Sequence, residues 1–257
     1  MAGRDAIGSL ASRIKSARFV LIFTGAGIST GSGIPDFRGP QGLWKTWKPV
    51  YFEDFISSHQ ARVKHWEFKH AGWNGFRNAQ PNRAHHALAR LEQRGRLQLL
   101  VTQNIDGLHR RAGNSHEKTI ELHGTNLEVE CVSCGARSDP ETAYRSFAET
   151  HEPPTCTACG GFLKPATVSF GQAMPVDKLE RAFREARLAD LVIAIGSTLE
   201  VEPAASVPLA AKRCGAFYAI INLGRTAHDA IADLCIEEDA CTVLPRLVEE
   251  ATAPSSE

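Results

Sequence analysis

A glycine-rich turn directly follows the apolar run at residues 19–23. It reads Gly25, Ala26, Gly27, Ile28 and Ser29. After a strand, such a turn lets backbone N–H groups approach a pyrophosphate, and a helix N-terminus beyond it adds partial positive charge. The usual dinucleotide fingerprint is incomplete, because Thr30 replaces its third glycine and no carboxylate follows about 20 residues on. The turn predicts a dinucleotide site unlike that of a standard dehydrogenase.

A short polar and aromatic segment continues this turn. Its residues are the rigid Pro35, the acidic Asp36, the aromatic Phe37 and the basic Arg38. This combination suits a loop that closes over a bound ligand.

Polar residues also follow other apolar runs. Because the carboxyl ends of parallel strands form the edge where open α/β sheets bind ligands, these residues predict one long crevice. The amide of Asn104 and the carboxylate of Asp106 could read the carboxamide of nicotinamide. For Gly196, Ser197, Thr198 and Asn222, a helix cap or a turn is the alternative. His123 adds an imidazole suited to proton transfer. The further strand-end candidates are Gln103, Ile105, Gly196, Ser197, Thr198 and Asn222.

Four cysteines form two C-x-x-C pairs separated by 21 residues, Cys131 with Cys134 and Cys156 with Cys159. This spacing is typical of zinc sites, and four thiolates leave no open position for water. Disulfide bonds are the alternative, but they are rare in intracellular proteins. The pairs predict one structural zinc ion. Three other cysteines are expected to be small buried side chains, namely Cys214, Cys235 and Cys241.

The elements that must position these residues alternate along the 257-residue chain. Apolar runs at 19–23, 97–101, 166–170, 191–195 and 218–221 are typical of buried strands, and helical patterns lie between them. The order predicts an α/β fold: a parallel sheet with helices on both faces. Two segments interrupt it, an aromatic-rich one at 41–80 and a cysteine-rich one at 125–164.

These interruptions predict a smaller zinc-ribbon and helical module beside the sheet. The helical part of that module is expected at 41–80 and the zinc part at 125–164. The sheet domain is then expected in three pieces, at 1–40, 81–124 and 165–257.

Charge and hydropathy exclude some classes of protein. Lys plus Arg and Asp plus Glu number 29 each, so no bulk charge attracts nucleic acid or a membrane. No apolar run reaches the roughly 20 residues that span a bilayer, and the N-terminus lacks a signal-peptide core. We expect a cytoplasmic protein. The basic N-terminus faintly resembles a transit peptide, but Ile7, Leu10 and Ile14 at helical spacing favour a first helix packed on the sheet.

The motifs GAGIST, GIPDFRG, TQNIDGLH, ELHGT, the two C-x-x-C pairs and KPATVSFGQAMP occur in one order along the chain. From about residue 7 to residue 248 the sequence resembles the sirtuins of bacterial type, which are NAD-dependent protein deacetylases or deacylases. The resemblance implies that acyl-lysine peptide and NAD meet between a Rossmann-like domain and a zinc and helical module. It also implies that NAD is consumed as a co-substrate.

The resemblance implies a role for each matching residue. His123 would be the general base, with Asn104 and Asp106 also catalytic. The peptide would lie along Val168, Phe170, Gly171, Leu199 and Val201, pairing as an added strand. NAD would contact Gly25, Ala26, Gly27, Ile28, Ser29, Pro35, Asp36, Phe37, Arg38, Trp44, Gln103, Asn104, Ile105, Asp106, Gly196, Ser197, Thr198, Asn222, Leu223 and Ala240.

The implied reaction transfers the acyl group from lysine to ADP-ribose, releasing nicotinamide and O-acyl-ADP-ribose. A mono-ADP-ribosyltransferase and an NAD hydrolase are alternatives with the same NAD chemistry. A zinc-ribbon nucleic-acid module is disfavoured, because acids outnumber bases within the zinc segment. The sequence leaves the acyl chain, the protein targets and the pathway open, and a monomer is expected. Gln172 stands where the family usually has Glu in the peptide-binding segment.

Overall fold

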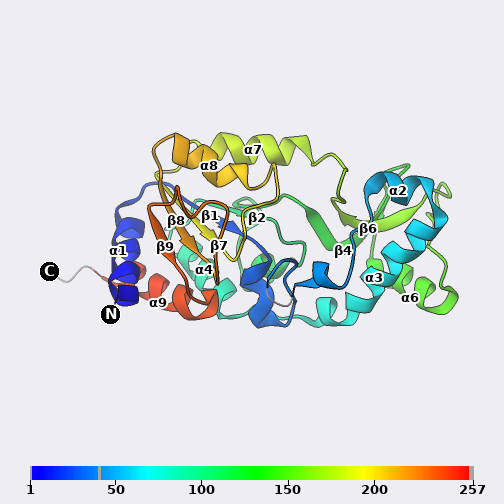
Figure 1. The fold of residues 1–257 in the computed structure, drawn as a ribbon, viewed down its shortest axis with the longest axis horizontal. Coiled ribbons are helices and arrows are strands. Elements are labelled where there is room, and N and C mark those ends of the chain that lie inside the picture. The colour runs from blue at the N-terminus through cyan, green and yellow to red at the C-terminus, as the bar shows by residue number, and fades with distance from the viewer. Residues whose placement is uncertain (1, 40–41, 255–257) are drawn as a thin grey trace.

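The computed structural model describes residues 2–39 and 42–254. A larger and a smaller lobe lie side by side along the long axis of the molecule (Figure 1). The larger lobe holds a six-stranded sheet and the smaller lobe a three-stranded sheet. The border expected between residues 40 and 41 lies outside the described residues. Within the described ranges, no helix is both long and apolar enough to cross a membrane.

The large sheet has the strand order β3-β2-β1-β7-β8-β9, and every neighbouring pair is parallel. The runs at 19–23, 97–101, 191–195 and 218–221 are confirmed as strands, with ends shifted by a residue or two. The two outer strands were not expected, because three residues show too little periodicity. The bounds are β1 (Val20–Thr24), β2 (Leu99–Thr102), β3 (Thr119–Glu121), β7 (Leu191–Ile195), β8 (Phe217–Ile221) and β9 (Leu234–Ile236).

Helices cover both faces of this sheet, as the sequence predicts (Figure 1). Along β1, Val20 and Ile22 pack with α1 (Ala2–Ser16), α4 (Arg83–Gln93) and α9 (Ala240–Thr252). Leu21 and Phe23 face the other way and pack with α7 (Val176–Ala186) and α8 (Ser206–Arg213). Both sides of the strand are buried, which explains its unbroken apolar sequence. The first helix is confirmed, with Ile7, Leu10 and Ile14 buried in it.

The smaller lobe combines the two expected insertions. Helices α2 (Phe52–Ser57) and α3 (His59–Asn78) come from the first, and α6 (Pro140–Thr150) comes from the second. Trp66 of α3 packs against Tyr144 and Phe147 of α6, and its indole N–H donates to the Leu163 carbonyl at 3.1 Å. One apolar core therefore joins both insertions.

The antiparallel sheet of this lobe has the order β5-β4-β6. Its strands are β4 (Gly124–Cys131), β5 (Arg137–Ser138) and β6 (Leu163–Thr167). The expectation that the run at 166–170 belongs to the parallel sheet is wrong, because β6 pairs antiparallel with β4. A buried apolar run does not reveal which sheet it joins. Strand β6 also crosses the expected border between residues 164 and 165.

Strands β1 and β7 mark the point where the direction of chain winding reverses. From β1 the chain adds β2 and β3 on one side, and from β7 it adds β8 and β9 on the other. Open α/β sheets bind ligands outside the carboxyl ends of the strands at such a switch point. Thr24, Thr102, Ile195 and Ile221 end their strands at this edge.

Candidate active site

The glycine-rich turn lies directly over the switch point. The N–H of Gly25 donates to the Ile195 carbonyl at 3.0 Å, and the N–H of Gly27 donates to the Gly196 carbonyl at 2.8 Å. A Cβ atom on Gly25 would lie 2.7 Å from the Gly196 oxygen, and one on Gly196 would lie 2.4 Å from the Ile28 nitrogen. Glycine is therefore required here by contact between two backbones. The turn continues into the 3-10 helix at Ala26–Ser32.

We expect Gly196→Ala to lower NAD affinity more than tenfold and to destabilise the protein. Gly196 has a φ of 62°, and its new methyl group would meet the backbone of Ile28. The left-handed conformation alone costs a side chain roughly 1–2 kcal/mol. Gly215→Ala is the matched control, because Gly215 has a φ of 97° with open space around it. Equal NAD affinity in both variants, measured by calorimetry, would contradict this account.

Ser29, Asn104 and Asp106 form a buried polar group beneath this turn. The Ser29 hydroxyl donates to Asp106 Oδ2 at 2.7 Å. Asn104 Nδ2 donates to the Gly25 carbonyl at 3.1 Å and to Ser29 Oγ at 3.2 Å. Burial raises the pKa of the Asp106 carboxyl, while hydrogen bonds from Leu108 N–H and the Ser29 hydroxyl oppose that shift. Both amide hydrogens of Asn104 are engaged, so its Oδ1 is the atom left for a ligand.

His123 lies just before β4, where the chain passes from the large lobe to the small one. Its Nδ1 is 3.0 Å from the Gln103 carbonyl, which can only accept, so Nδ1 carries the proton and Nε2 is a free acceptor. The His123 carbonyl accepts from Val168 N–H at 2.9 Å. Burial lowers the pKa of the imidazole below 6.5, and the Gln103 hydrogen bond opposes the shift. The arrangement presents a neutral base with a fixed tautomer.

The segment at Pro35–Arg38 begins a compact turn. Asp36 Oδ1 accepts from Gly39 N–H at 2.9 Å, and Trp44 N–H donates to the Phe37 carbonyl at 3.1 Å. The rings of Phe37 and Trp44 are 5.0 Å apart. Arg38 Nε lies 3.4 Å from Glu200 Oε2, an ion pair to the loop after β7. Arg38 therefore links this turn to the segment that begins at Leu199.

Gln103, Ser197, Asn222 and Ala240 continue the same edge of the sheet. Gln103 Nε2 donates to Ser197 Oγ at 2.8 Å, which links the ends of β2 and β7. Asn222 N–H donates to the Ile236 carbonyl at 3.2 Å, and Ala240 is buried in the first turn of α9. Leu223 differs from these residues, because it is 65% exposed. Ile105 accepts from Asn126 N–H at 2.9 Å, and the Thr198 carbonyl accepts from Ala227 N–H at 3.0 Å.

The residues expected to flank a peptide lie on two segments. Val168, Phe170 and Gly171 follow β6, and the Phe170 carbonyl accepts from Phe52 N–H at 2.8 Å. Leu199 is buried with a φ of 58°, and its N–H donates to Ser197 Oγ at 3.2 Å. Val201 is two residues further on and half-buried. Gln172 Oε1 accepts from Ser169 N–H at 3.1 Å, so this amide closes a turn in its own segment.

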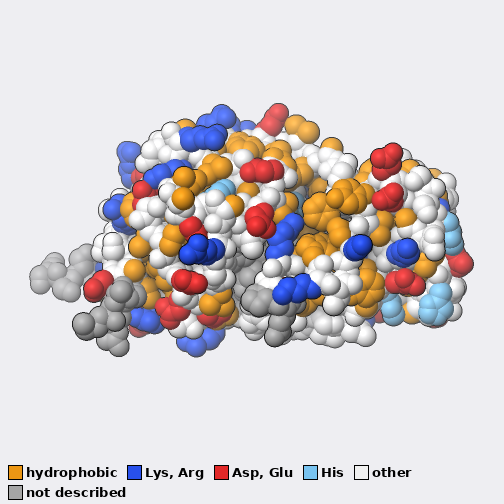
Figure 2. Space-filling model, in the orientation of Figure 1, with side chains coloured by type: hydrophobic (Ala, Val, Ile, Leu, Met, Phe, Trp, Pro, Cys, Tyr) orange, Lys and Arg blue, Asp and Glu red, His pale blue; other side chains and the backbone are white. Residues whose placement is uncertain are grey.

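An aromatic cluster adjoins these segments. Trp44 contacts Phe68 and Phe170, with ring centroids 5.9 Å and 6.1 Å away, and Trp47 and Tyr51 extend the cluster. Figure 2 shows hydrophobic side chains gathered over the junction between the lobes. Trp47 is 36% exposed and Tyr51 is 54% exposed, so the cluster borders solvent.

The four paired cysteines converge at the end of β4. Their sulfurs all lie within 4.8 Å of one another, with Cys131 and Cys159 3.5 Å apart. A tetrahedral zinc ion with Zn–S bonds of about 2.3 Å separates its sulfurs by about 3.8 Å, so the donor set fits zinc. All seven cysteines are free thiols, so the disulfide alternative is not observed.

The expectation for the remaining cysteines is wrong. Cys214 and Cys235 are exposed, and Cys241 is half-buried. Cys214 follows the last turn of α8, and Cys235 lies on the outermost strand, so the apolar neighbours in sequence do not cover either thiol.

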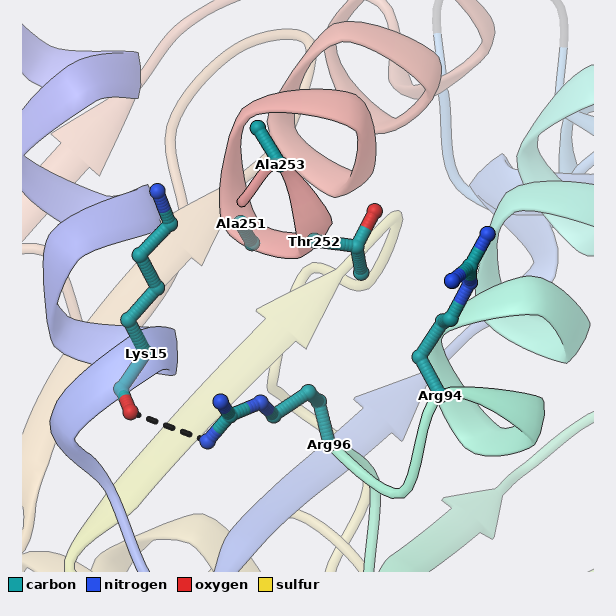
Figure 3. Close-up of a pocket in the computed structure, with 6 residues that line it drawn as sticks. All are labelled: Lys15, Arg94, Arg96, Ala251, Thr252 and Ala253. Atoms are coloured by element: carbon teal, nitrogen blue, oxygen red, sulfur yellow. Dashed lines mark hydrogen bonds between the residues drawn. The ribbon is translucent and has the colours of Figure 1, made fainter. Parts of the chain in front are cut away.

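A basic cavity at the opposite edge of the sheet is unrelated to this site (Figure 3). Lys15, Arg94 and Arg96 line it together with the end of α9. These cations stand at the C-terminal ends of α1 and α4, where positive charge complements the helix carbonyls. Arg96 Nη1 donates to the Lys15 carbonyl at 3.0 Å.

Four polar residues beside the site were not expected to belong to it, namely Thr24, Thr102, His85 and His109. Thr24 and Thr102 are the polar last residues of otherwise apolar strands, and this pattern in the sequence could have identified them. The two histidines lie on helices α4 and α5 (Leu108–Ala112) and are buried beneath the glycine turn. The ion pair of Glu200 with Arg38 could not be predicted, because the two residues are far apart in the sequence.

Comparison with known proteins identifies the family. Residues 25–203 match the Sir2 family. The chain is a sirtuin. It is 45% identical over 233 residues to an NAD-dependent protein deacetylase of Rhodopseudomonas palustris, covering 91% of this chain and 92% of that protein. It is 42% identical over 248 residues to an NAD-dependent protein deacylase of Thermococcus kodakarensis, covering 94% of each.

Solved structures resemble this sirtuin over nearly its whole length. A Sir2 variant with deacetylated p53 peptide and 3′-O-acetyl ADP ribose gives a TM-score of 0.89 at 38% identity, covering 96% of this sirtuin and 99% of that chain. Sir2 bound to acetylated peptide gives a TM-score of 0.84 at 37% identity, and the match covers 95% of this sirtuin and 98% of that chain. The Rossmann-like fold with a four-cysteine module is thus the Sir2 fold.

Proposed function

We propose that this sirtuin is an NAD-dependent protein lysine deacylase that uses NAD as a co-substrate. The observation that carries the proposal is the fixed tautomer of His123, whose Nδ1 is held by the Gln103 carbonyl and whose own carbonyl accepts from Val168 N–H in the segment after β6. The deacetylases and the deacylase among its relatives support the same reaction. The Sir2 structure with acetylated peptide supports an acyl-lysine peptide as the partner.

The proposed NAD path follows the carboxyl edge of the sheet. The glycine turn and Ile28 surround the pyrophosphate, and Gly196, Ser197, Thr198, Asn222, Leu223 and Ala240 line the adenosine end. Ser29, Asn104, Ile105 and Asp106 form the nicotinamide pocket, with Gln103 toward a ribose hydroxyl. Pro35, Asp36, Phe37, Arg38 and Trp44 belong to the closing loop.

The peptide is proposed to add a strand between two segments. These are Val168 to Gly171 on one side and Leu199 to Val201 on the other. The aromatic cluster beside Phe170 gives the acyl chain apolar surroundings and is compatible with acyl chains of different lengths.

NAD supplies a cationic nicotinamide that leaves when the acyl-lysine carbonyl oxygen bonds to the ribose C1. The residues of this chain hold that geometry and move one proton. His123 Nε2 accepts a proton from a ribose hydroxyl, which then attacks the acyl carbon. Water completes the release of free lysine and O-acyl-ADP-ribose. General base catalysis of this kind contributes roughly 10²–10⁴ in rate.

The pH profile of turnover follows from the lowered pKa of His123. Neutral imidazole is the base, and burial keeps it neutral to a pH below the ordinary value of 6.5. We therefore expect kcat/KM, which reports the free enzyme, to fall on the acid side with an inflection below pH 6.5. Lysine release measured between about pH 5 and 8 checks this. An inflection at or above 6.5 would contradict the assignment.

Mass spectrometry tests the reaction itself. Purified protein is incubated with NAD and acetyl-, succinyl- and long-chain acyl-lysine peptides, and three products are followed together. Parallel release of nicotinamide, free lysine and O-acyl-ADP-ribose supports deacylation and identifies the acyl group. Nicotinamide without lysine would indicate the ADP-ribosyltransferase or the NAD hydrolase instead. The monomeric state, the cytoplasmic location and the absence of nucleic-acid and membrane partners stay predictions.

A further inference from the structure

A second set of buried hydrogen bonds lies beneath the proposed nicotinamide pocket. Thr24 Oγ1 donates to Thr102 Oγ1 at 2.8 Å, and His109 Nε2 lies 2.9 Å from Thr24 Oγ1. Thr102 Oγ1 also accepts from the backbone N–H of Asn104 at 3.0 Å. The chain of contacts therefore leads from His109 on α5 through the ends of β1 and β2 to Asn104.

The directions of these bonds fix the state of His109. The hydroxyl hydrogen of Thr24 is used toward Thr102, so Thr24 Oγ1 accepts from His109 and the proton is on Nε2. Burial and the neighbouring His85 lower the pKa of His109 well below its ordinary value, which keeps the ring neutral. The ring centroids of His85 and His109 are 4.9 Å apart. The Nδ1 atom of His109 is buried and has no hydrogen-bond partner among the residues that the structure describes.

An imidazole at this position is costly for the fold. His109 is 2% exposed, and an unpaired buried nitrogen costs roughly 1–3 kcal/mol. A leucine would fill similar space without that penalty. Among the described residues, the hydrogen bond that offsets this cost is the one from Nε2–H to Thr24.

The contact joins the two strand ends that carry the proposed site. Thr24 immediately precedes Gly25 of the glycine turn, and Thr102 immediately precedes Gln103 and Asn104. Asn104 in turn donates to the Gly25 carbonyl, which closes a ring of hydrogen bonds around both strand ends. A small shift of either end would misplace Asn104 relative to the turn.

We propose that His109 is a positioning residue for Asn104, acting through Thr24 and Thr102. This inference rests on the proposed deacylase function, because Asn104 has its role in the nicotinamide pocket there. His109 does not touch substrate. It holds the strand ends so that the amide of Asn104 meets the nicotinamide end of NAD in one geometry.

Four variants of the full-length protein test this proposal. His109→Leu removes the donor and keeps the bulk, whereas His109→Gln can still donate from Nε2. Thr24→Val breaks the link one step further on, and the fourth variant combines His109→Leu with Thr24→Val. Each is measured below its melting temperature for kcat, for the KM of NAD and of peptide, and for nicotinamide inhibition. NAD affinity is also measured by calorimetry without peptide.

We expect His109→Leu to lower kcat/KM for NAD about 5- to 150-fold, the range that corresponds to a lost buried hydrogen bond of 1–3 kcal/mol. Nicotinamide inhibition should weaken, the KM for peptide should stay the same, and His109→Gln should recover most of the loss. The double variant should be no worse than either single variant, because both break one chain of contacts.

Two results would overturn the proposal. One is a lower melting temperature for His109→Leu with unchanged NAD kinetics and affinity, which is the outcome of a purely structural role. The other is a His109→Gln variant as defective as His109→Leu. A wild-type protein that binds NAD but releases no lysine would instead refute the deacylase function. Calorimetry of NAD binding would still decide the role of His109.

Discussion

His123→Ala is expected to lower kcat for lysine release by roughly 10²–10⁴. The reason lies in the position of Nε2, which is the free acceptor of a ring whose Nδ1–H is held by the Gln103 carbonyl. Alanine leaves no group to take the proton from the ribose hydroxyl. Steps before that transfer need no base, so peptide-dependent exchange of labelled nicotinamide into NAD should persist.

The measurement compares lysine release with nicotinamide exchange in the same samples. His116→Ala serves as the matched control, because His116 is exposed and lies outside the site. If His123→Ala releases lysine at the wild-type rate, the assigned base is wrong. If exchange is lost along with lysine release while NAD still binds, His123 acts earlier than proposed.

Cys131→Ser is expected to remove the zinc ion and to loosen the small lobe. Zinc binding to structural four-ligand sites is worth on the order of 10 kcal/mol in zinc-finger peptides, so losing one ligand forfeits much of that stabilisation. Cys131 ends β4, and β4 begins at Gly124, directly after His123. Disorder in this strand therefore reaches the base, and activity should fall together with zinc content.

Zinc content is measured by atomic emission, stability by thermal unfolding, and activity by lysine release. Cys214→Ser is the control, since that thiol is exposed and far from the cluster in sequence. A zinc-free Cys131→Ser protein with wild-type melting and turnover would refute the structural role. The core of Trp66, Tyr144 and Phe147 contains none of the four cysteines, so partial retention of small-lobe helices is expected.

The features that could be predicted from the sequence are those that depend on a pattern of neighbouring residues. The strand at Leu191–Ile195 and the cysteine pairs were readable because a buried strand and a zinc cluster each require a fixed local pattern. Contacts between residues that only the fold brings together could not be predicted from the sequence. The Arg38–Glu200 ion pair and the contact of His109 with Thr24 join residues far apart in the chain, and no periodicity encodes them. Cys235 shows the same limit, because its exposure depends on β9 being the outer strand.

The pairing of β1 with β7 has a consequence for the newly made chain. Phe19 N–H, just before β1, bonds to Asp190, which lies 171 residues later. At synthesis rates of roughly 5–20 residues per second, that partner emerges about 10–30 s after β1. All residues of the small lobe's sheet leave the ribosome within that interval. Until then one edge of β1 presents unpaired backbone N–H and C=O groups, so we expect chaperones that shield open strand edges to bind this chain during translation.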